Sequence, residues 1–199
     1  MDPGTLERPK CTSWDNSNCE GTPLCPPRCP RFVDKNGVPI LVRRSEAEDF
    51  EDIVEMYQKL DSTSRAMGLP PNGEDALRGW LRALTDNGWS MVAFEDDMVV
   101  GHVGVSPATT SDPEFVIFVL DDYQNRGIGT ELVKHTIAWA GSFSHDALTL
   151  EVMKKNRPAL TVYQNVGFEV SDQQGMSLTL RLSLQELVAE QVQRPPAER

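Results

Sequence analysis

Apolar and polar positions follow two different periods along this chain. Runs in which apolar residues are continuous or fall at every second position predict strands, and runs with apolar residues three and four positions apart predict helices. From residue 37 to about residue 191, runs of the two kinds follow one another. The pattern predicts an α/β domain over residues 38–182, preceded by an N-terminal extension (1–37) and followed by a C-terminal helix and tail (183–199). We expect residues 193–199 of this tail to be disordered.

The expected elements can be placed by their apolar spacing and their end signals. Ser45 and Glu48 have the spacing of a capping box at the start of the first helix, and Pro158 and Gly167 fit the first turn and the stop of a later one. We expect strands at residues 37–44, 89–94, 99–105, 115–120, 147–152, 168–170 and 176–182, and helices at 45–60, 74–84, from 128, 158–166 and 183–191.

One stretch combines a strand, a glycine loop and the start of a helix. An apolar run over residues 115–120 is followed by the loop Gln124–Gly129, and helical spacing begins at Ile128. The first N–H groups of a helix have no intrahelical partner and carry partial positive charge, so this order predicts an anion site. Glycines let a phosphate approach the backbone, and Arg126 could add a charged contact.

The loop reads Gln-Asn-Arg-Gly-Ile-Gly. It is not the dinucleotide-binding fingerprint, because position 132 is Leu132, and it lacks the Gly-Lys-Ser/Thr of a P-loop. A lone Gly-x-Gly fits a tight strand-to-helix turn equally well. Gln-x-x-Gly-x-Gly after a strand that ends in Val-x-Asp is more specific, and it resembles the pyrophosphate-binding motif of the GNAT superfamily of N-acetyltransferases.

A second match to the same family lies downstream. Asn156-Arg-Pro-Ala is followed four residues later by Tyr163 and then by Gly167-Phe168, in the order and spacing typical of GNAT enzymes. The resemblance covers roughly residues 39–182. It implies a GNAT-type fold, a mixed, mostly antiparallel twisted sheet with helices on both faces, in which the cofactor enters between the fourth and fifth strands.

The resemblance also implies acetyl-CoA as the cosubstrate. In the family, the glycine loop holds the pyrophosphate, and strand backbone pairs with the amides of the pantetheine arm. On its own, Asn156 would be read as a helix N-cap. The residues to which the resemblance assigns acetyl-CoA contacts are Phe118, Val119, Leu120, Gln124, Asn125, Arg126, Gly127, Ile128, Gly129, Thr130 and Asn156.

Acetyl transfer to an amine needs a neutral amine and a proton for the leaving thiolate. An unperturbed lysine keeps its proton up to about pH 10.4, so a general base would help. Glu114 precedes the apolar strand on the same face as Val116 and Phe118, and it resembles the strand Glu of GNAT lysine acetyltransferases; the alternative is a surface carboxylate. Tyr163 is the candidate general acid, and the alternative is a packed helical ring with a wet hydroxyl.

We therefore expect an N-acetyltransferase that moves an acetyl group directly from acetyl-CoA to a primary amine. The acceptor is a protein lysine, an N-terminus or a small-molecule amine. The alternative is a non-catalytic acyl-CoA-binding sensor in which the N-terminal extension is a docking or regulatory module.

The extension holds all the cysteines of the chain and many prolines. Four thiolates close in sequence favour a structural metal in a reducing compartment, and zinc would suit them. The spacing, Cys-x7-Cys-x5-Cys-x3-Cys, is not a strong zinc pattern, so free or disulfide-paired thiols are the alternative. The predicted ligands are Cys11, Cys19, Cys25 and Cys29.

Composition narrows the partners further. The 199 residues suit one domain with extensions, and the formal charge of −11 argues against non-specific nucleic-acid binding. No run has the length of a membrane span, and the start has no signal-peptide pattern. We expect a cytoplasmic protein, monomeric or homodimeric, with no nucleic-acid or membrane partner.

Overall fold

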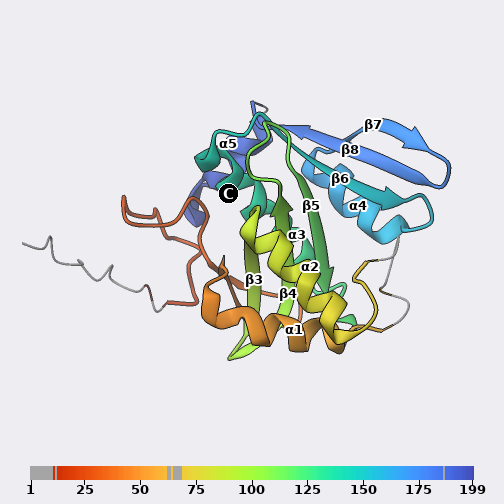
Figure 1. Ribbon diagram of the computed structural model, residues 1–199. Helices are drawn as coiled ribbons and strands as arrows, with labels where there is room; N and C mark the ends of the chain where they lie inside the picture. Colours follow the sequence, from red (N-terminus) through yellow and green to blue (C-terminus); the bar gives the residue numbers. More distant parts are fainter. Residues whose placement is uncertain (1–10, 12, 62–63, 65–68, 186) are drawn as a thin grey trace, which may run out of the picture.

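The computed structural model describes residues 11, 13–61, 64, 69–185 and 187–199 (Figure 1). The strands are β1 (Arg31–Val33), β2 (Pro39–Arg44), β3 (Trp89–Glu95), β4 (Met98–Ser106), β5 (Glu114–Val119), β6 (Ala147–Met153), β7 (Glu169–Gln174) and β8 (Ser177–Ser183). The α-helices are α1 (Phe50–Gln58), α2 (Glu74–Asp86), α3 (Ile128–Ala140), α4 (Arg157–Val166) and α5 (Leu187–Gln193). The strands and helices expected from apolar spacing are thus present, with shifted ends.

The described strands form a single sheet in the order β1-β2-β3-β4-β5-β6-β8-β7. β5 and β6 run parallel, and every other neighbouring pair in this order is antiparallel. The prediction of a mixed, mostly antiparallel sheet is confirmed. In this strand order, the parallel pair joins the meander β1–β5 to a three-stranded part formed by β6, β8 and β7.

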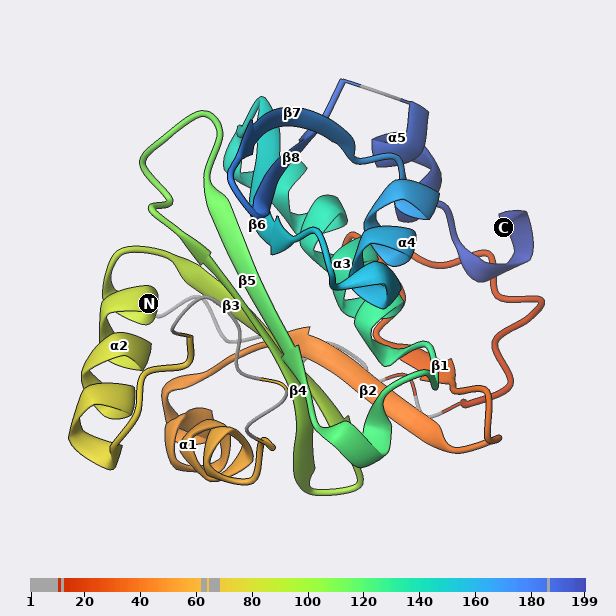
Figure 2. The ribbon, with the colours of Figure 1, turned by 90° about the vertical axis from the view of Figure 1, so that its right-hand side faces the viewer.

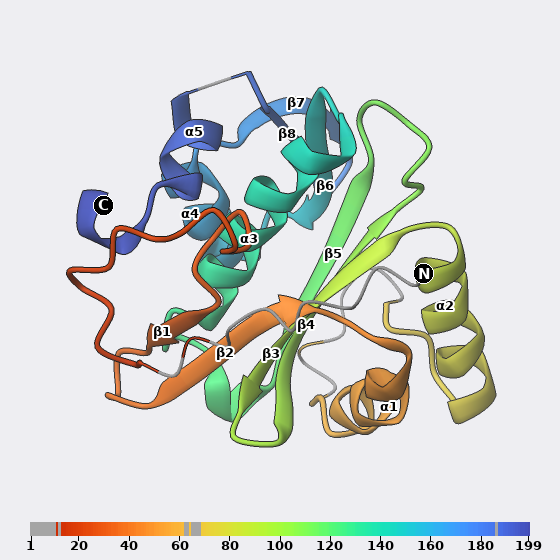
Figure 3. The same ribbon diagram turned by 90° about the vertical axis from the view of Figure 1, so that its left-hand side faces the viewer.

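Helices cover both faces of the sheet. Figures 2 and 3 show α1 and α2 on one face and α3, α4 and α5 on the other. β3 and β4 lie between the two helical layers, which is why they are buried along nearly their whole length, whereas β7 at the edge is exposed throughout. Within the described part of the chain, no helix combines the length and hydropathy that a membrane span requires.

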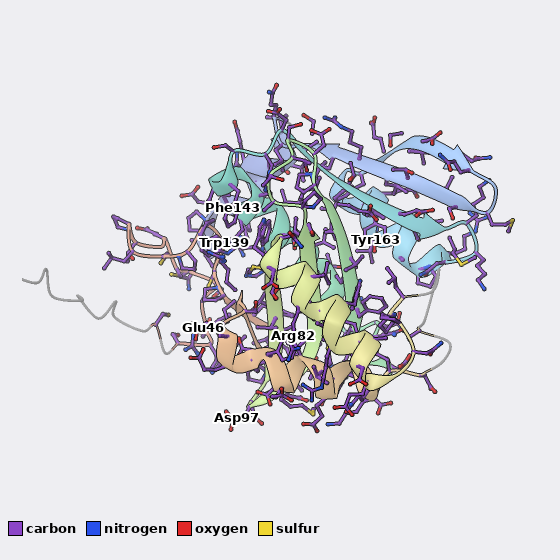
Figure 4. All side chains as sticks on the ribbon, in the orientation of Figure 1. Glu46, Arg82, Asp97, Trp139, Phe143 and Tyr163 are labelled. Atoms are coloured by element: carbon purple, nitrogen blue, oxygen red, sulfur yellow. The ribbon has the colours of Figure 1, made fainter. Side chains whose placement is uncertain are left out.

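The first helix is capped by different residues from those expected. The Ser45 hydroxyl is hydrogen-bonded to the Ser90 hydroxyl instead of capping the helix. The chain enters α1 through a 3₁₀ turn, η1 (Ala47–Asp49), and Asp49 accepts the Glu46 N–H at 2.7 Å. Glu46 is labelled at this helix end in Figure 4. The capping box therefore consists of Glu46 and Asp49 and starts one residue after Ser45, because the Ser45 hydroxyl is bonded to Ser90 of β3.

Described parts of the N-terminal extension and of the C-terminal tail pack against the domain. β1 comes from the N-terminal extension and is the first strand of the sheet. Arg28 is buried and forms a bidentate ion pair with Glu131 at the start of α3. Residues 193–199, expected to be disordered, include a 3₁₀ turn, and Ala197 N–H donates to Cys19 O at 3.1 Å. That expectation was wrong, because the tail pairs with the extension.

Candidate functional site

β5 and β6 are neighbours in the sheet that pair only where β5 begins. β5 pairs with β4 from Ser106↔Glu114 to Gly101↔Val119, but its register with β6 is given by Glu114↔Thr149. Figure 1 shows the two strands separating from this point. Because an unpaired strand edge leaves N–H and C=O groups without ladder partners, this opening can accept an extended ligand with amide groups.

The end of β5 directs alternate peptide groups into the opening. Leu120 N–H donates to Val100 O at 3.0 Å, on the β4 side. Peptide groups alternate between the two edges of a strand, so those of Phe118 also face β4, while those of Val119 face β6. The Gln124 amide donates to Val119 O at 3.2 Å. Of the three strand residues predicted to contact pantetheine, Val119 is therefore the one whose backbone faces the opening.

The Phe118 side chain belongs to an aromatic cluster beneath α1 and α2. Its ring lies 5.2 Å from Tyr57 and 6.4 Å from Trp80, edge to face in both cases. The Tyr57 hydroxyl and His102 Nδ1 are 2.9 Å apart, and burial lowers the pKa of His102 to about 3. His102 is thus a neutral core residue at pH 7. The cluster packs α1 and α2 against the face of β5 that carries Phe118.

The loop Gln124–Gly129 turns the chain from β5 into α3. It follows a 3₁₀ turn, η3 (Asp121–Tyr123), and passes through left-handed conformations at Asn125 (φ 61°) and Gly127 (φ 98°). Gly127 is the N-cap of α3, so the N–H groups of residues 128–130 have no intrahelical acceptor. Together with the helix dipole, these N–H groups can attract an anion where β5 ends.

Within the described part of the chain, nothing requires residue 129 to be glycine. Its φ is not positive, and a Cβ built on it would lie 3.8 Å from Val119 Cγ2, an ordinary contact distance. Ile128 beside it is fully buried, so its side chain belongs to the core and only its N–H is available. Val119, the residue next to Gly129, is the last residue of β5. The absence of a side chain at Gly129 therefore leaves space beside the opening between β5 and β6.

The Arg126 side chain is held by residues of other segments and by the turn before the loop. Its side chain forms ion pairs with Asp34 and Glu95 and lies over the Tyr123 ring, 4.5 Å from the centroid. Two carboxylates thus engage Nε and Nη2, and a charged contact from Arg126 to a phosphate stays a prediction. A backbone contact from this residue stays a prediction.

Glu114 lies at the point where β5 and β6 meet. It is exposed, and its register partner Thr149 places it on the same face as Glu151. Partial burial and the charge of Glu151 raise the pKa of Glu114. Its carboxylate has no ion pair with the described part of the chain. A carboxylate with a raised pKa and a free edge suits proton abstraction, so the predicted role as base remains open to test.

Tyr163 lies on the inner side of α4, beside β5 (Figure 4). Its ring packs edge to face on Phe115 and Phe168, at 6.1 and 6.0 Å. Burial raises the pKa of the Tyr163 phenol well above its usual range. The hydroxyl therefore keeps its proton at neutral pH, and the same low-dielectric surroundings would raise the basicity of a thiolate beside it. The role of general acid stays a prediction.

Asn156 is the N-cap of α4, as the local reading of its motif suggested. Its Oδ1 accepts the Ala159 N–H at 3.2 Å, and Gly167 ends the helix with φ 108°. The Asn-x-x-Ala spacing thus has a structural role whatever the ligand, and a contact between Asn156 and acetyl-CoA stays a prediction.

The four cysteines do not form a zinc site. Cys25 Sγ accepts the Thr22 N–H at 3.3 Å, and Cys29 Sγ accepts from the Asn16 amide at 3.3 Å. Cys11 and Cys19 are also free thiols. In the part of the chain that the structure describes, no three His, Cys, Asp or Glu side chains converge to hold a metal ion. The zinc prediction is not supported, because the segment is held by hydrogen bonds to its own turns and to the domain.

Sequence reasoning missed the residues around Arg126. Asp34 and Glu95 are its partners, and they lie 92 and 31 positions away along the chain. The Asp-Lys-Asn-Gly sequence from residue 34 is a turn signal that could have placed Asp34 between two strands. No local pattern indicates that this turn meets the glycine loop.

Comparisons with known proteins show what the sequence of the chain is similar to. The family model described as Acetyltransferase (GNAT) family matches residues 51–168. The L-amino acid N-acetyltransferase AaaT of Escherichia coli (strain K12) is 27% identical over 138 residues, which are 66% of this chain and 83% of that protein. The Xenopus tropicalis protein named Probable N-acetyltransferase camello is 36% identical over 91 residues, which are 44% of this chain and only 42% of the relative.

A solved structure with its cofactor has the same fold. The protein yncA from Salmonella typhimurium, determined with acetyl-CoA, superposes with a TM-score of 0.62 at 18% identity, covering 74% of this chain and 95% of that one. The chain therefore shares the overall fold of that protein.

Proposed function

The chain belongs to the GNAT acetyltransferase family, and we propose that it is an N-acetyltransferase that moves an acetyl group from acetyl-CoA to a primary amine by direct transfer. One observation carries the proposal. The free N–H groups at the start of α3 lie where β5 ends, and beside them the β5 edge is unpaired toward β6. A pyrophosphate on the helix and an amide-containing arm along the strand would use both features at once.

The distances along β5 suit that ligand. Val119 lies five positions after Glu114, which is about 17 Å of extended strand at roughly 3.3 Å per residue. An extended pantetheine arm has a comparable length. A pyrophosphate at the start of α3 lies beside the Val119 end of β5. The extended arm would then place the thioester near the Glu114 end, where β5 and β6 meet.

The proposed reaction requires two proton transfers. The neutral amine attacks the thioester carbonyl carbon, a C–N bond forms, and the C–S bond breaks with its electron pair going to sulfur. Glu114 takes the proton that the amine nitrogen loses, directly or through water, and Tyr163 gives a proton to the thiolate. The raised pKa of Glu114 supports its role, since the carboxylate is more basic than usual. The Tyr163 phenol is protonated at neutral pH, as donation requires, but its raised pKa makes it a weaker acid than a free phenol.

The acceptor is a primary amine on a protein lysine, an N-terminus or a small molecule. Glu114 and Glu151 give the face beside the opening negative charge, which attracts a cationic amine before it loses its proton. The E. coli relative is named for L-amino acids, which supports including free α-amines among the acceptors.

A titration and a turnover assay test the proposal together. Calorimetry would measure acetyl-CoA binding, and free-thiol release would be followed with L-amino acids, a lysine peptide and a peptide with a free N-terminus. We expect binding and amine-dependent thiol release, and a Glu114→Gln, Tyr163→Phe double variant that binds but transfers nothing. Glu169→Gln, an exposed glutamate on β7, is the control for loss of one surface charge.

The outcomes distinguish the enzyme from the alternative. Acetyl-CoA binding without turnover on any acceptor would favour a non-catalytic acyl-CoA sensor. Turnover that the double variant retains would refute the roles of Glu114 and Tyr163 but not the class of reaction.

A further inference from the structure

The side chain of Arg126 is held on three sides, next to the start of α3. Asp34 pairs with Nε, Glu95 accepts from Nη2 at 3.3 Å, and the Tyr123 ring lies under the guanidinium. The Tyr123 hydroxyl donates in turn to Glu95. The Asp34 side chain is 0% exposed and that of Arg126 is 13% exposed. In this network two carboxylates engage Nε and Nη2 of Arg126, and the Tyr123 ring packs on the face of the guanidinium.

Asp34 is itself fixed by the turn between β1 and β2. Its Oδ1 accepts the N–H groups of Asn36 and Val38, both at 2.9 Å, and its Oδ2 faces Arg126. Burial alone would raise the pKa of Asp34, but the backbone donors and Arg126 outweigh it and hold the pKa below its usual value. The carboxylate is therefore ionised and rigid at neutral pH.

The same turn also holds the backbone of the glycine loop. Lys35 N–H donates to Arg126 O at 3.1 Å. In a trans peptide, the carbonyl of one residue and the N–H of the next lie in one plane and point in opposite directions. Fixing Arg126 O toward the turn therefore fixes the Gly127 N–H away from it. Both the side chain and the carbonyl of Arg126 thus connect the turn to the helix N-cap.

The charges in the network do not favour an anion nearby. The guanidinium is flanked by two carboxylates, Asp34 and Glu95, so the network adds negative charge next to the proposed pyrophosphate site. A contribution to phosphate binding through space would have the wrong sign. What the network can provide is a fixed geometry for the N–H groups that follow it.

We propose that Asp34 is a positioning residue for acetyl-CoA: through Arg126 it fixes the glycine loop in the conformation that presents its N–H groups to the pyrophosphate. This inference rests on the proposed function, and it assigns residues of the N-terminal extension to the cofactor site. The two explanations for the carboxylate predict opposite results when it is neutralised. Positioning predicts weaker acetyl-CoA binding, and charge acting through space predicts tighter binding.

The test compares Asp34→Asn with a matched control, Asp49→Asn. Both aspartates are buried, and each accepts hydrogen bonds from an arginine and from the backbone: two N–H groups at Asp34 and the Glu46 N–H at Asp49. Asp49, however, pairs with Arg43 at the entry to α1, outside the glycine loop. Calorimetry would give the Kd of acetyl-CoA, steady-state kinetics its KM and kcat, and thermal unfolding the Tm of each variant.

We expect the Asp34→Asn variant to raise the Kd and KM of acetyl-CoA about tenfold, the effect of one charged hydrogen bond, with kcat at saturation unchanged. Both variants should lower Tm by a similar amount, but Asp49→Asn should leave the Kd of acetyl-CoA unchanged. A second variant, Arg126→Lys, keeps the charge but loses the planar fork that contacts both carboxylates, so it should also weaken binding. If Asp34→Asn does not fold, Arg126→Lys tests the inference in its place.

Three results would overturn the inference. Unchanged or tighter acetyl-CoA binding in Asp34→Asn, or wild-type affinity in Arg126→Lys, would show that the network does not position the loop while leaving the proposed function intact. An equal rise in Kd for Asp49→Asn would show a general effect of lower stability. A wild-type protein that does not bind acetyl-CoA would overturn both this inference and the proposed function.

Discussion

Replacing Gly129 by alanine should separate stability from cofactor binding. The position is in the first turn of α3 and has a helical backbone, and a methyl group there would meet Val119 Cγ2 at 3.8 Å without a clash. Alanine loses less conformational freedom than glycine when a helix forms, which stabilises the fold by about 0.5–1 kcal/mol. For a chain of this size, that is an increase in Tm of roughly 1–4 °C.

The same methyl group should weaken acetyl-CoA binding. It would stand beside the N–H groups that the pyrophosphate is proposed to contact, where an oxygen must approach the nitrogen within about 3 Å. Loss of one hydrogen bond to a charged group costs about 1.5–3 kcal/mol, which is roughly a 10- to 150-fold increase in Kd. Thermal unfolding and calorimetry on one protein preparation would measure both effects.

Gly79→Ala in α2 is the matched control. A Cβ at Gly79 meets nothing within 4 Å, so the stabilising effect should be similar, and α2 lies on the other face of the sheet. We expect a rise in Tm in both variants and weaker acetyl-CoA binding only in Gly129→Ala. Wild-type affinity in Gly129→Ala would refute the assignment of the pyrophosphate to the start of α3.

Three further predictions concern the catalytic residues and the cysteines. Because Glu114 must be deprotonated to act as base and its pKa is raised, kcat/KM should rise with pH through a pKa above the usual value near 4.5; Glu151→Gln removes the repelling charge and should move this rise to lower pH. A pH–rate profile with unchanged limbs in that variant would contradict the assignment. Tyr163→Phe keeps the packed ring, so Tm and KM should be retained while kcat falls about 100-fold; an unchanged kcat would exclude the phenol as general acid. Treatment with a metal chelator should leave Tm and acetyl-CoA affinity unchanged, since the cysteines hold no metal site in the described structure, and a large drop in Tm would restore the zinc hypothesis.

Local patterns carried most of the fold. Strand and helix periods placed the elements from β2 to β8. Gly167 marked the end of α4 because a helix often ends at a residue with a left-handed backbone, which glycine adopts easily. The glycine loop could be read for the same reason. An N-cap with φ 98° at Gly127 leaves a signature in a few consecutive residues.

Contacts between distant segments could not be read in this way. The pairing of Asp34 with Arg126 depends on the sheet bringing the β1–β2 turn beside the loop after β5, and neither segment carries a pattern that names the other. Proximity in sequence also misled: four cysteines in the extension predicted one metal site, but Cys25 and Cys29 bond to different neighbours. Likewise, the Ser45 hydroxyl is drawn to Ser90 by strand packing that the helix signal does not contain.

The most direct test of the account is a single experiment with the wild-type protein. Acetyl-CoA would be titrated in a calorimeter, and the same sample would then be assayed for free-thiol release with each class of amine. Binding with amine-dependent thiol release would agree with a pyrophosphate on α3 and a thioester near Glu114. The absence of any heat of binding would contradict the reading of the loop Gln124–Gly129 as the acetyl-CoA site, and the proposed function with it.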